Sequence, residues 1–118
     1  HDFAVISLSD LMTPWDLIEK RLAAAAMGDF CMAIYNPSSH NRADYLKRAC
    51  DILLKNGVEP ERACGYVENI GRDNTKATTC RLEELKERQV NMFTTVFIGN
   101  SRTKIIDGKL VTPRGYNI

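Results

Sequence analysis

The stretch AAAAMGDFCMAIYNP, residues 23–37, contains the change from helix to strand that decides the fold. Its alanine run favours helix, and Gly28 is typical of the position just after a helix. Residues 30–35 then form an apolar run of strand length, which predicts a strand covered on both faces. Pro37 disfavours helix at Asn36 and so ends the strand.

The sequence before this stretch predicts a first strand and the start of its helix. Residues 3–8 are typical of a strand. In the Thr13–Asp16 segment, Thr13 is expected to cap the helix and Pro14 to take its first position. Asp16 is then favoured by the positive end of the helix dipole.

The sequence after Pro37 predicts a second helix, with Ser39 or Asn41 as its cap and Asn56-Gly57 as its end. One face of this helix is apolar at the spacing i, i+3, i+4, i+7, i+8, formed by Tyr45, Leu46, Ala49, Ile52 and Leu53. Further elements are expected in order: a strand over 64–69, a polar loop over 70–76, a short edge strand over 77–80, a helix over 82–88 and a strand over 93–99.

Two short β segments complete the pattern. Residues 103–106 and 109–112 bracket Asp107-Gly108, a dipeptide typical of a two-residue hairpin turn. The chain therefore predicts a single α/β domain, residues 1–118, with a mixed sheet of about five strands flanked by helices on its faces.

Composition excludes several classes of function. A formal net charge of +1 predicts no strong affinity for nucleic acid or for an anionic membrane, and no apolar run is long enough to span a bilayer. The four cysteines form no Cys-x-x-Cys unit, and His1 and His40 are the only histidines. We therefore expect reduced thiols in a cytoplasmic protein, and no protein-bound metal.

Three predicted strands end on asparagine, in the segments Tyr35–Pro37, Glu68–Gly71 and Ile98–Ser101. Ligands of open α/β sheets bind at the carboxyl ends of strands, and an amide side chain offers both a donor and an acceptor. Any one of these segments is also an ordinary way to end a strand. If all three meet on one sheet edge, they predict a ligand pocket. Phosphate-binding and hydrolase motifs are absent from the sequence, and we assign no catalytic residue.

The chain resembles a known family in four blocks: LSDLMTPW (8–15), AIYNP (33–37), MFTTVFIGNS (92–101) and VTPRGY (111–116). In this order they resemble the C-terminal half of precorrin-3B C(17)-methyltransferases, which are tetrapyrrole methylases of cobalamin biosynthesis. The resemblance covers nearly the whole chain. The chain begins with His1 rather than Met, and a predicted strand follows at once. We therefore interpret the chain as a domain cut from a larger enzyme.

The resemblance implies a two-domain enzyme, usually a homodimer, with S-adenosylmethionine (SAM) held between the domains. The enzyme would methylate carbon 17 of precorrin-3B, or of its cobalt form, while the macrocycle contracts. The N-terminal domain, with its Gly-rich motif, would be missing, residues 1–11 would form the interdomain strand and connection, and this part alone would be inactive. The implied cofactor contacts are Tyr35, Asn36, Asn69, Ile70, Gly99 and Asn100, and Asp10 is the candidate substrate contact.

The chain departs from the family pattern at one implied cofactor position. The wider superfamily often has Met-Gly where this chain has Asn36-Pro37. Two other functions stay open. The chain could belong to a tetrapyrrole methylase with a different target carbon, or it could be a small α/β ligand-binding module without catalysis.

Overall fold

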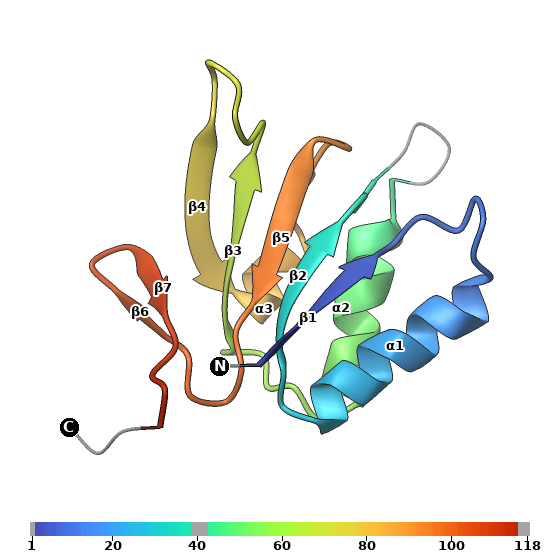
Figure 1. The fold of residues 1–118 in the computed structure, drawn as a ribbon, viewed down its shortest axis with the longest axis horizontal. Coiled ribbons are helices and arrows are strands. Elements are labelled where there is room, and N and C mark those ends of the chain that lie inside the picture. The colour runs from blue at the N-terminus through green and yellow to red at the C-terminus, as the bar shows by residue number, and fades with distance from the viewer. Residues whose placement is uncertain (1, 39–42, 116–118) are drawn as a thin grey trace.

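A computed structural model describes residues 2–38 and 43–115 (Figure 1). The first residue His1, the two candidate caps Ser39 and Asn41, and Tyr116 of the last family block lie outside the described residues. The elements follow the predicted order: β1 (Phe3–Ser7), α1 (Trp15–Met27), β2 (Cys31–Tyr35), α2 (Tyr45–Lys55), β3 (Ala63–Glu68), β4 (Lys76–Arg81), α3 (Leu82–Leu85), β5 (Thr94–Ile98), β6 (Lys104–Ile106) and β7 (Lys109–Val111).

The main sheet has five strands in the order β1-β2-β5-β3-β4, as Figure 1 shows. β1 and β2 are parallel, whereas β5 lies between β2 and β3 and is antiparallel to both. β4 is antiparallel to β3 and occupies an edge. The predicted mixed sheet of about five strands and the predicted edge strand are therefore confirmed.

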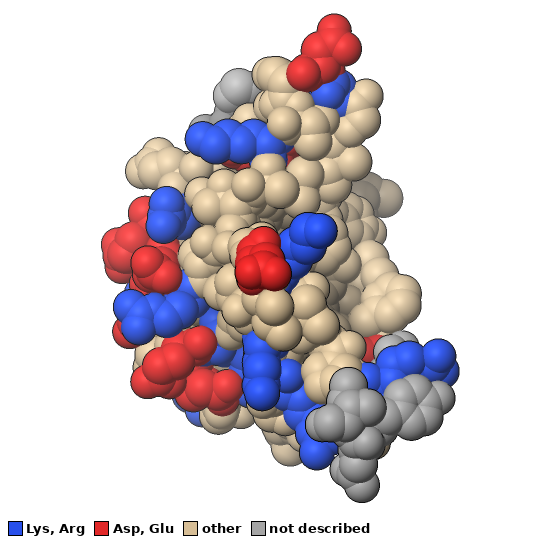
Figure 2. Space-filling model, turned by 90° about the vertical axis from the view of Figure 1, so that its left-hand side faces the viewer, with Lys and Arg blue, Asp and Glu red and all other residues tan. Residues whose placement is uncertain are grey.

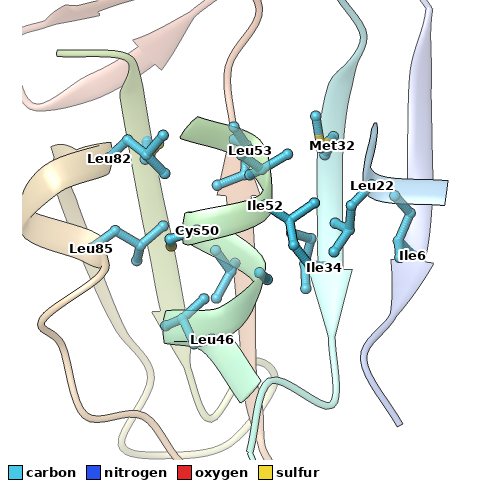
Figure 3. Close-up of a cluster of buried hydrophobic side chains, with 14 of the residues drawn as sticks. Ile6, Leu22, Met32, Ile34, Leu46, Cys50, Ile52, Leu53, Leu82 and Leu85 are labelled. Atoms are coloured by element: carbon cyan, nitrogen blue, oxygen red, sulfur yellow. The ribbon is translucent and has the colours of Figure 1, made fainter. Parts of the chain in front are cut away.

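The hydrophobic core lies between the helices and one face of the sheet (Figure 3). Alternate strand residues such as Met32 and Ile34 of β2 point into this core and are buried. Their neighbours point to the other face, where Tyr35 is 45% exposed. The prediction that β2 is covered on both faces is therefore wrong: the helices cover one face only, so burial alternates along the strand.

Helix α1 differs from the prediction at its start and agrees with it at its end. It begins at Trp15 with Pro14 in the cap position, and no side chain caps it, so the predicted Thr13 cap is wrong. The extended Pro14 places its own carbonyl to accept the Leu17 N–H at 3.0 Å. Gly28 does end the helix, but the left-handed residue is Asp29, with φ of 57°.

The hairpin of β6 and β7 forms a separate two-stranded sheet. Its turn residues Asp107 and Gly108 have φ of 52° and 73°, which confirms the predicted two-residue turn. The hairpin lies in front of the sheet face that the helices leave open, on the left of Figure 1. A cavity of about 390 Å³ separates it from that face.

Candidate active-site edge and its relatives

The three asparagine-bearing strand ends do not share one edge of the sheet. β5 runs opposite to β2 and β3, and the Gly99 N–H donates to the carbonyl of Ala63, at the start of β3, at 2.9 Å. At the other edge, the Asn69 N–H donates to the carbonyl of Phe93, just before β5, at 3.2 Å. The prediction of a common edge is therefore wrong for Gly99 and Asn100. Asn36 and Asn69 do end parallel strands on the same side, which we call the carboxyl edge.

Asn36 is held at the carboxyl edge by a residue that the sequence did not single out. Its side-chain amide donates to Ser7 Oγ at 3.1 Å, and the same hydroxyl accepts the Ser9 N–H at 3.2 Å. Asn36 has φ of 53°, in the left-handed region that asparagine tolerates better than most residues. The turn directs the chain away from the sheet directly after Tyr35, whose ring stays half exposed.

Asn69 makes the corresponding turn after β3. Its φ is 57°, and its carbonyl accepts the Thr75 hydroxyl at 2.8 Å and the Arg72 N–H at 3.0 Å. These bonds close the 69–75 loop on itself. Ile70 stands at the beginning of this loop with 52% of its surface exposed. An exposed apolar side chain is thus fixed beside a left-handed asparagine.

Apolar side chains continue along this edge at the start of β5. Met92 and Phe93 are 45% and 50% exposed, and the guanidinium of Arg72 lies 4.3 Å from the centre of the Phe93 ring. No role was assigned to these residues from the sequence, because they lie at the beginning of a predicted strand rather than at its end. Only the antiparallel direction of β5 brings them to the carboxyl edge.

A hollow of about 400 Å³ adjoins Tyr35 and Asn36 on the β1 side. Such a volume is within the usual range for small-molecule sites. Its lining mixes polar and apolar groups: Val5, Ile6, Ser7, Ser9, Met12, Thr13, Arg21, Tyr35 and Asn36. Met12 is 92% exposed, so the connection after β1 presents an apolar side chain to this hollow.

Asp10 lies in the same connection, where its carboxylate accepts a short hydrogen bond from the Tyr45 hydroxyl. The Tyr45 ring stacks on Trp15, with centroids 5.4 Å apart, and the Arg48 guanidinium lies 4.2 Å from the Trp15 ring. These contacts tie the connection to the beginnings of α1 and α2. The candidate substrate residue is therefore held in place by a buried tyrosine.

Gly99 and Asn100 build the loop at the opposite edge. The Gly99 carbonyl accepts a 2.9 Å bond from the buried guanidinium of Arg62. The Asn100 side-chain oxygen accepts the Arg102 N–H at 2.9 Å. Close by, the left-handed Asp29 accepts the Ser101 N–H at 2.8 Å. These polar groups support the path of the chain from β5 to the hairpin.

Within residues 2–38 and 43–115, no group of three or more His, Cys, Asp or Glu side chains could hold a metal ion. Over the same ranges, no helix combines the length and apolar character needed to cross a membrane. Of the four thiols, Cys31 is half-buried and the other three are buried.

Known proteins are similar to this chain in sequence and in fold. No protein-family model matches the chain. A cobalamin biosynthesis protein, CbiHC, from Archaeoglobus fulgidus is 46% identical over 116 residues, which are 98% of this chain and 25% of the relative. A probable cobalt-factor III C(17)-methyltransferase from Salmonella typhimurium is 41% identical over the whole chain and is covered to 48%. The chain is similar in sequence to a part of each of these two relatives. It spans about half or less of the length of the curated relatives it matches.

Solved structures agree with this similarity. The crystal structure of the methyltransferase CobJ has a TM-score of 0.84 and 34% identity over 96% of the domain and 47% of CobJ. A uroporphyrin-III C-methyltransferase from Thermus thermophilus, solved with S-adenosylhomocysteine, has a TM-score of 0.63 over 84% of the domain and 40% of its own chain. At 20% identity, this second likeness shows the shared fold alone. The predicted tetrapyrrole methylase fold is confirmed.

Proposed function

We propose that this domain is part of a SAM-dependent methyltransferase that methylates carbon 17 of precorrin-3B, or of its cobalt form, with ring contraction in cobalamin biosynthesis. The observation that carries the proposal is the 41% identity, over the whole chain, to a probable cobalt-factor III C(17)-methyltransferase. The proposed full-length protein has a preceding domain, with residues 1–11 as the interdomain strand and connection. It acts in the cytoplasm as a homodimer on a corrinoid substrate.

The carboxyl edge is the proposed site of the cofactor. Tyr35, Asn36, Asn69 and Ile70 lie there with exposed apolar surface and amide groups, which suit the adenine ring and the amino-acid end of SAM respectively. Gly99 and Asn100 lie at the other end of β5, about 17 Å away for a five-residue strand. The direction of β5 thus favours the first four residues over these two as contacts of one cofactor.

The proposed chemistry depends mainly on position. The sulfonium of SAM has a good leaving group, so the protein has to align the methyl group with the acceptor carbon and exclude water. The exposed apolar side chains of the carboxyl edge, together with Met12, would exclude water once covered. Asp10, oriented by Tyr45, is the proposed polar contact to the substrate. We assign no residue of this domain as acid or base.

The cofactor site is tested by titrating the ¹⁵N-labelled chain with S-adenosylhomocysteine and following backbone amide shifts. We expect shifts at Asn36, Asn69 and Ile70, with an affinity weaker than micromolar because half of the pocket is contributed elsewhere. Asn100 serves as the internal control and should not shift. Shifts confined to Gly99 and Asn100 would place the cofactor at the opposite edge of the sheet and contradict the proposed site. Micromolar affinity of the isolated domain would contradict a pocket that is divided between two domains.

The reaction is tested on a full-length protein that contains this domain. Incubation with methyl-labelled SAM and precorrin-3B or its cobalt form should give a ring-contracted product labelled at carbon 17, which ¹³C NMR identifies. Label at another carbon would favour the other tetrapyrrole methylases. No methyl transfer and no cofactor binding would favour a non-catalytic module. The isolated domain is expected to be inactive in the same assay.

A further inference from the structure

The hollow beside Asn36 contains a single charged side chain. Among the described residues that line it, only Arg21 carries a charge. Asp10 belongs to the neighbouring connection, but it does not line the hollow, and its carboxylate is bonded to the Tyr45 hydroxyl. On the face of the molecule that Figure 2 shows, by contrast, basic and acidic side chains are intermixed. The guanidinium of Arg21 has no ion pair in the part of the chain that the structure describes.

Helix geometry directs Arg21 toward the carboxyl edge. α1 begins close to the end of β1 and runs back along the sheet, as Figure 1 shows. Arg21 lies in the second turn of this helix, between the buried Ile18 and Leu22, at the border of the face that packs on the core. Helical side chains tilt toward the N-terminus of their helix. The long side chain of Arg21 therefore extends toward the connection between β1 and α1, where it lines the hollow.

The hydroxyl groups of the hollow are arranged to donate hydrogen bonds. Ser7 Oγ accepts the Asn36 side-chain amide at 3.1 Å and the Ser9 N–H at 3.2 Å. A serine hydroxyl has two acceptor positions and one proton, so Ser7 has only its proton left to offer. No described residue accepts that proton or the hydroxyl proton of Thr13. A positive charge and hydroxyl donors thus line one hollow, and this arrangement suits an anion.

We propose that Arg21 and the Ser7 hydroxyl form a subsite for a carboxylate group. The planar guanidinium can donate two parallel N–H bonds to the two oxygens of a carboxylate, which a lysine cannot do. The inference rests on the proposed function and deepens it. Both ligands of that reaction carry carboxylates, the corrinoid on its acetate and propionate side chains and SAM at its amino-acid end. Neither ligand carries a phosphate, so a carboxylate is the anion that this hollow would receive.

The exposure of Arg21 sets the expected strength of the subsite. Hydrogen bonds to a charged partner each change affinity by about tenfold or more. The Arg21 side chain is exposed, so water competes with the ligand and the effect belongs to the lower end of that range. We therefore expect a loss of about tenfold when the guanidinium is removed. Replacement by lysine should cost less, because the charge remains while the second N–H bond is lost.

Propionate binding to the ¹⁵N-labelled chain tests the subsite without assuming the reaction. The side-chain Nε–H of Arg21 and the backbone N–H of Ser9 should shift and saturate at millimolar propionate, whereas the uncharged propionamide should not shift them. In Arg21→Gln the Ser9 shift should disappear. Lys20→Gln is the matched control, because it removes the same charge from the next position of α1, and Lys20 is exposed outside the lining of the hollow. Thermal melts establish that each variant folds.

The source of the carboxylate is identified in a full-length protein that contains this domain. If the cofactor supplies it, Arg21→Gln should weaken the binding of S-adenosylhomocysteine about tenfold in calorimetry. If the corrinoid supplies it, the same variant should raise the KM for precorrin-3B about tenfold and leave the affinity for S-adenosylhomocysteine unchanged. Arg21→Lys should recover part of the loss in either case, and Lys20→Gln should behave as the unmodified protein.

Several outcomes would overturn this subsite. Propionate shifts that do not saturate, that propionamide reproduces, or that persist at Ser9 in Arg21→Gln would do so. Equal losses in Lys20→Gln would assign the effect to the general charge of α1 and would also overturn it. Unchanged affinity and KM in full-length Arg21→Gln would contradict its role toward both ligands. A protein that binds propionate through Arg21 but transfers no methyl group would contradict the proposed function alone, so the two proposals can fail separately.

Discussion

The Gly99 N–H donates to the carbonyl of Ala63 at 2.9 Å, which places the end of β5 beside the beginning of β3. This bond separates two groups of asparagines that are equivalent in the sequence. Asn36 and Asn69 end strands at the carboxyl edge, whereas Asn100 follows a strand that runs the other way. The candidate cofactor site is therefore defined by strand direction more than by residue type.

The left-handed backbone at Asn69 predicts an unusual order of stability among its variants. An alanine pays a steric cost of about 1 kcal/mol or more in this conformation, and glycine does not. We expect Asn69→Ala to unfold at lower urea concentration than Asn69→Gly. Asn74, in the same loop but without positive φ, is the control: there the glycine variant should be no more stable than the alanine variant. Equal stability of the two Asn69 variants would contradict this reading.

Asp29 has a left-handed backbone, and its carboxylate accepts two hydrogen bonds from Ser101. The Ser101 N–H donates at 2.8 Å and the Ser101 hydroxyl at 2.5 Å. Asp29→Ala removes both bonds and keeps the strained backbone, so we expect a loss of about 1–2 kcal/mol. Asp29→Asn keeps one acceptor oxygen and should lose less than half of that. Urea denaturation distinguishes the two variants, and an equal loss in both would mean that the bonds to Ser101 do not stabilise the fold.

Arg62 is 7% exposed and joins two parts of the chain. It donates to both carboxylate oxygens of Glu59, at 2.6 and 2.9 Å, and to the Gly99 carbonyl at 2.9 Å. Arg62→Met should cost about 2–3 kcal/mol, because it leaves the Gly99 carbonyl without this donor. Arg81→Met, on an exposed ion pair, is the control and should cost less than about 1 kcal/mol. Similar losses in the two variants would contradict a special role for Arg62.

The contact between Arg62 and Glu59 also predicts how the stability of the fold depends on pH. The hydrogen bonds from Arg62 hold the pKa of Glu59 below its ordinary value. A carboxyl group with a lowered pKa in the folded state contributes stability above its unfolded pKa, and this contribution is lost as the pH falls through the folded pKa. From about pH 5 downward, the unmodified chain should therefore lose stability more steeply than Glu59→Gln. Parallel stability curves for the two proteins would refute this prediction.

The thiols should differ in reactivity. Burial raises the pKa of Cys50 to about 12 and also raises the pKa values of Cys64 and Cys80. At pH 8, a disulfide reagent such as Ellman's should therefore modify the half-buried Cys31 rapidly and the other three only on unfolding. Fast labelling of two or more thiols in the folded chain, or in Cys31→Ser, would count against this packing.

These thiols also predict lower stability in alkali. A thiol whose pKa is raised by folding contributes its stability below its unfolded pKa, and this stability is lost as the pH rises through the folded value. The loss should begin near pH 9, the ordinary value, and extend toward the value of about 12 for Cys50. Cys50→Ala should weaken this dependence, as urea titrations at pH 8 and pH 10 would measure, although the variant itself is less stable.

Much of the local structure was predictable because its causes are local. The apolar spacing in α2, Gly28 after α1 and Asp107-Gly108 between two β segments each act within a few residues. Their predictions are confirmed in type and order. The errors lie at the ends: Thr13 does not cap α1, and α3 ends at Leu85 rather than Arg88. Boundaries depend on contacts that a short segment does not contain.

The candidate site was only half predictable. Asn36 and Asn69 were identified because asparagine and a break follow an apolar run, and both do lie on one edge. Ser7, Met92 and Phe93 were missed, since nothing in their own neighbourhood marks them. They reach the carboxyl edge through β1 pairing beside β2 and through the reversed direction of β5.

The sequence by itself therefore determined which segments become helices and strands, which side chains are apolar enough to form the core, and which family the chain resembles. Tertiary structure alone decided that β5 is inserted between β2 and β3, that the helices cover one face, and that Asn100 lies opposite Asn69. The physical reason is that helix and turn preferences are set by near neighbours, whereas strand order and direction depend on how distant segments bury the same apolar surface together.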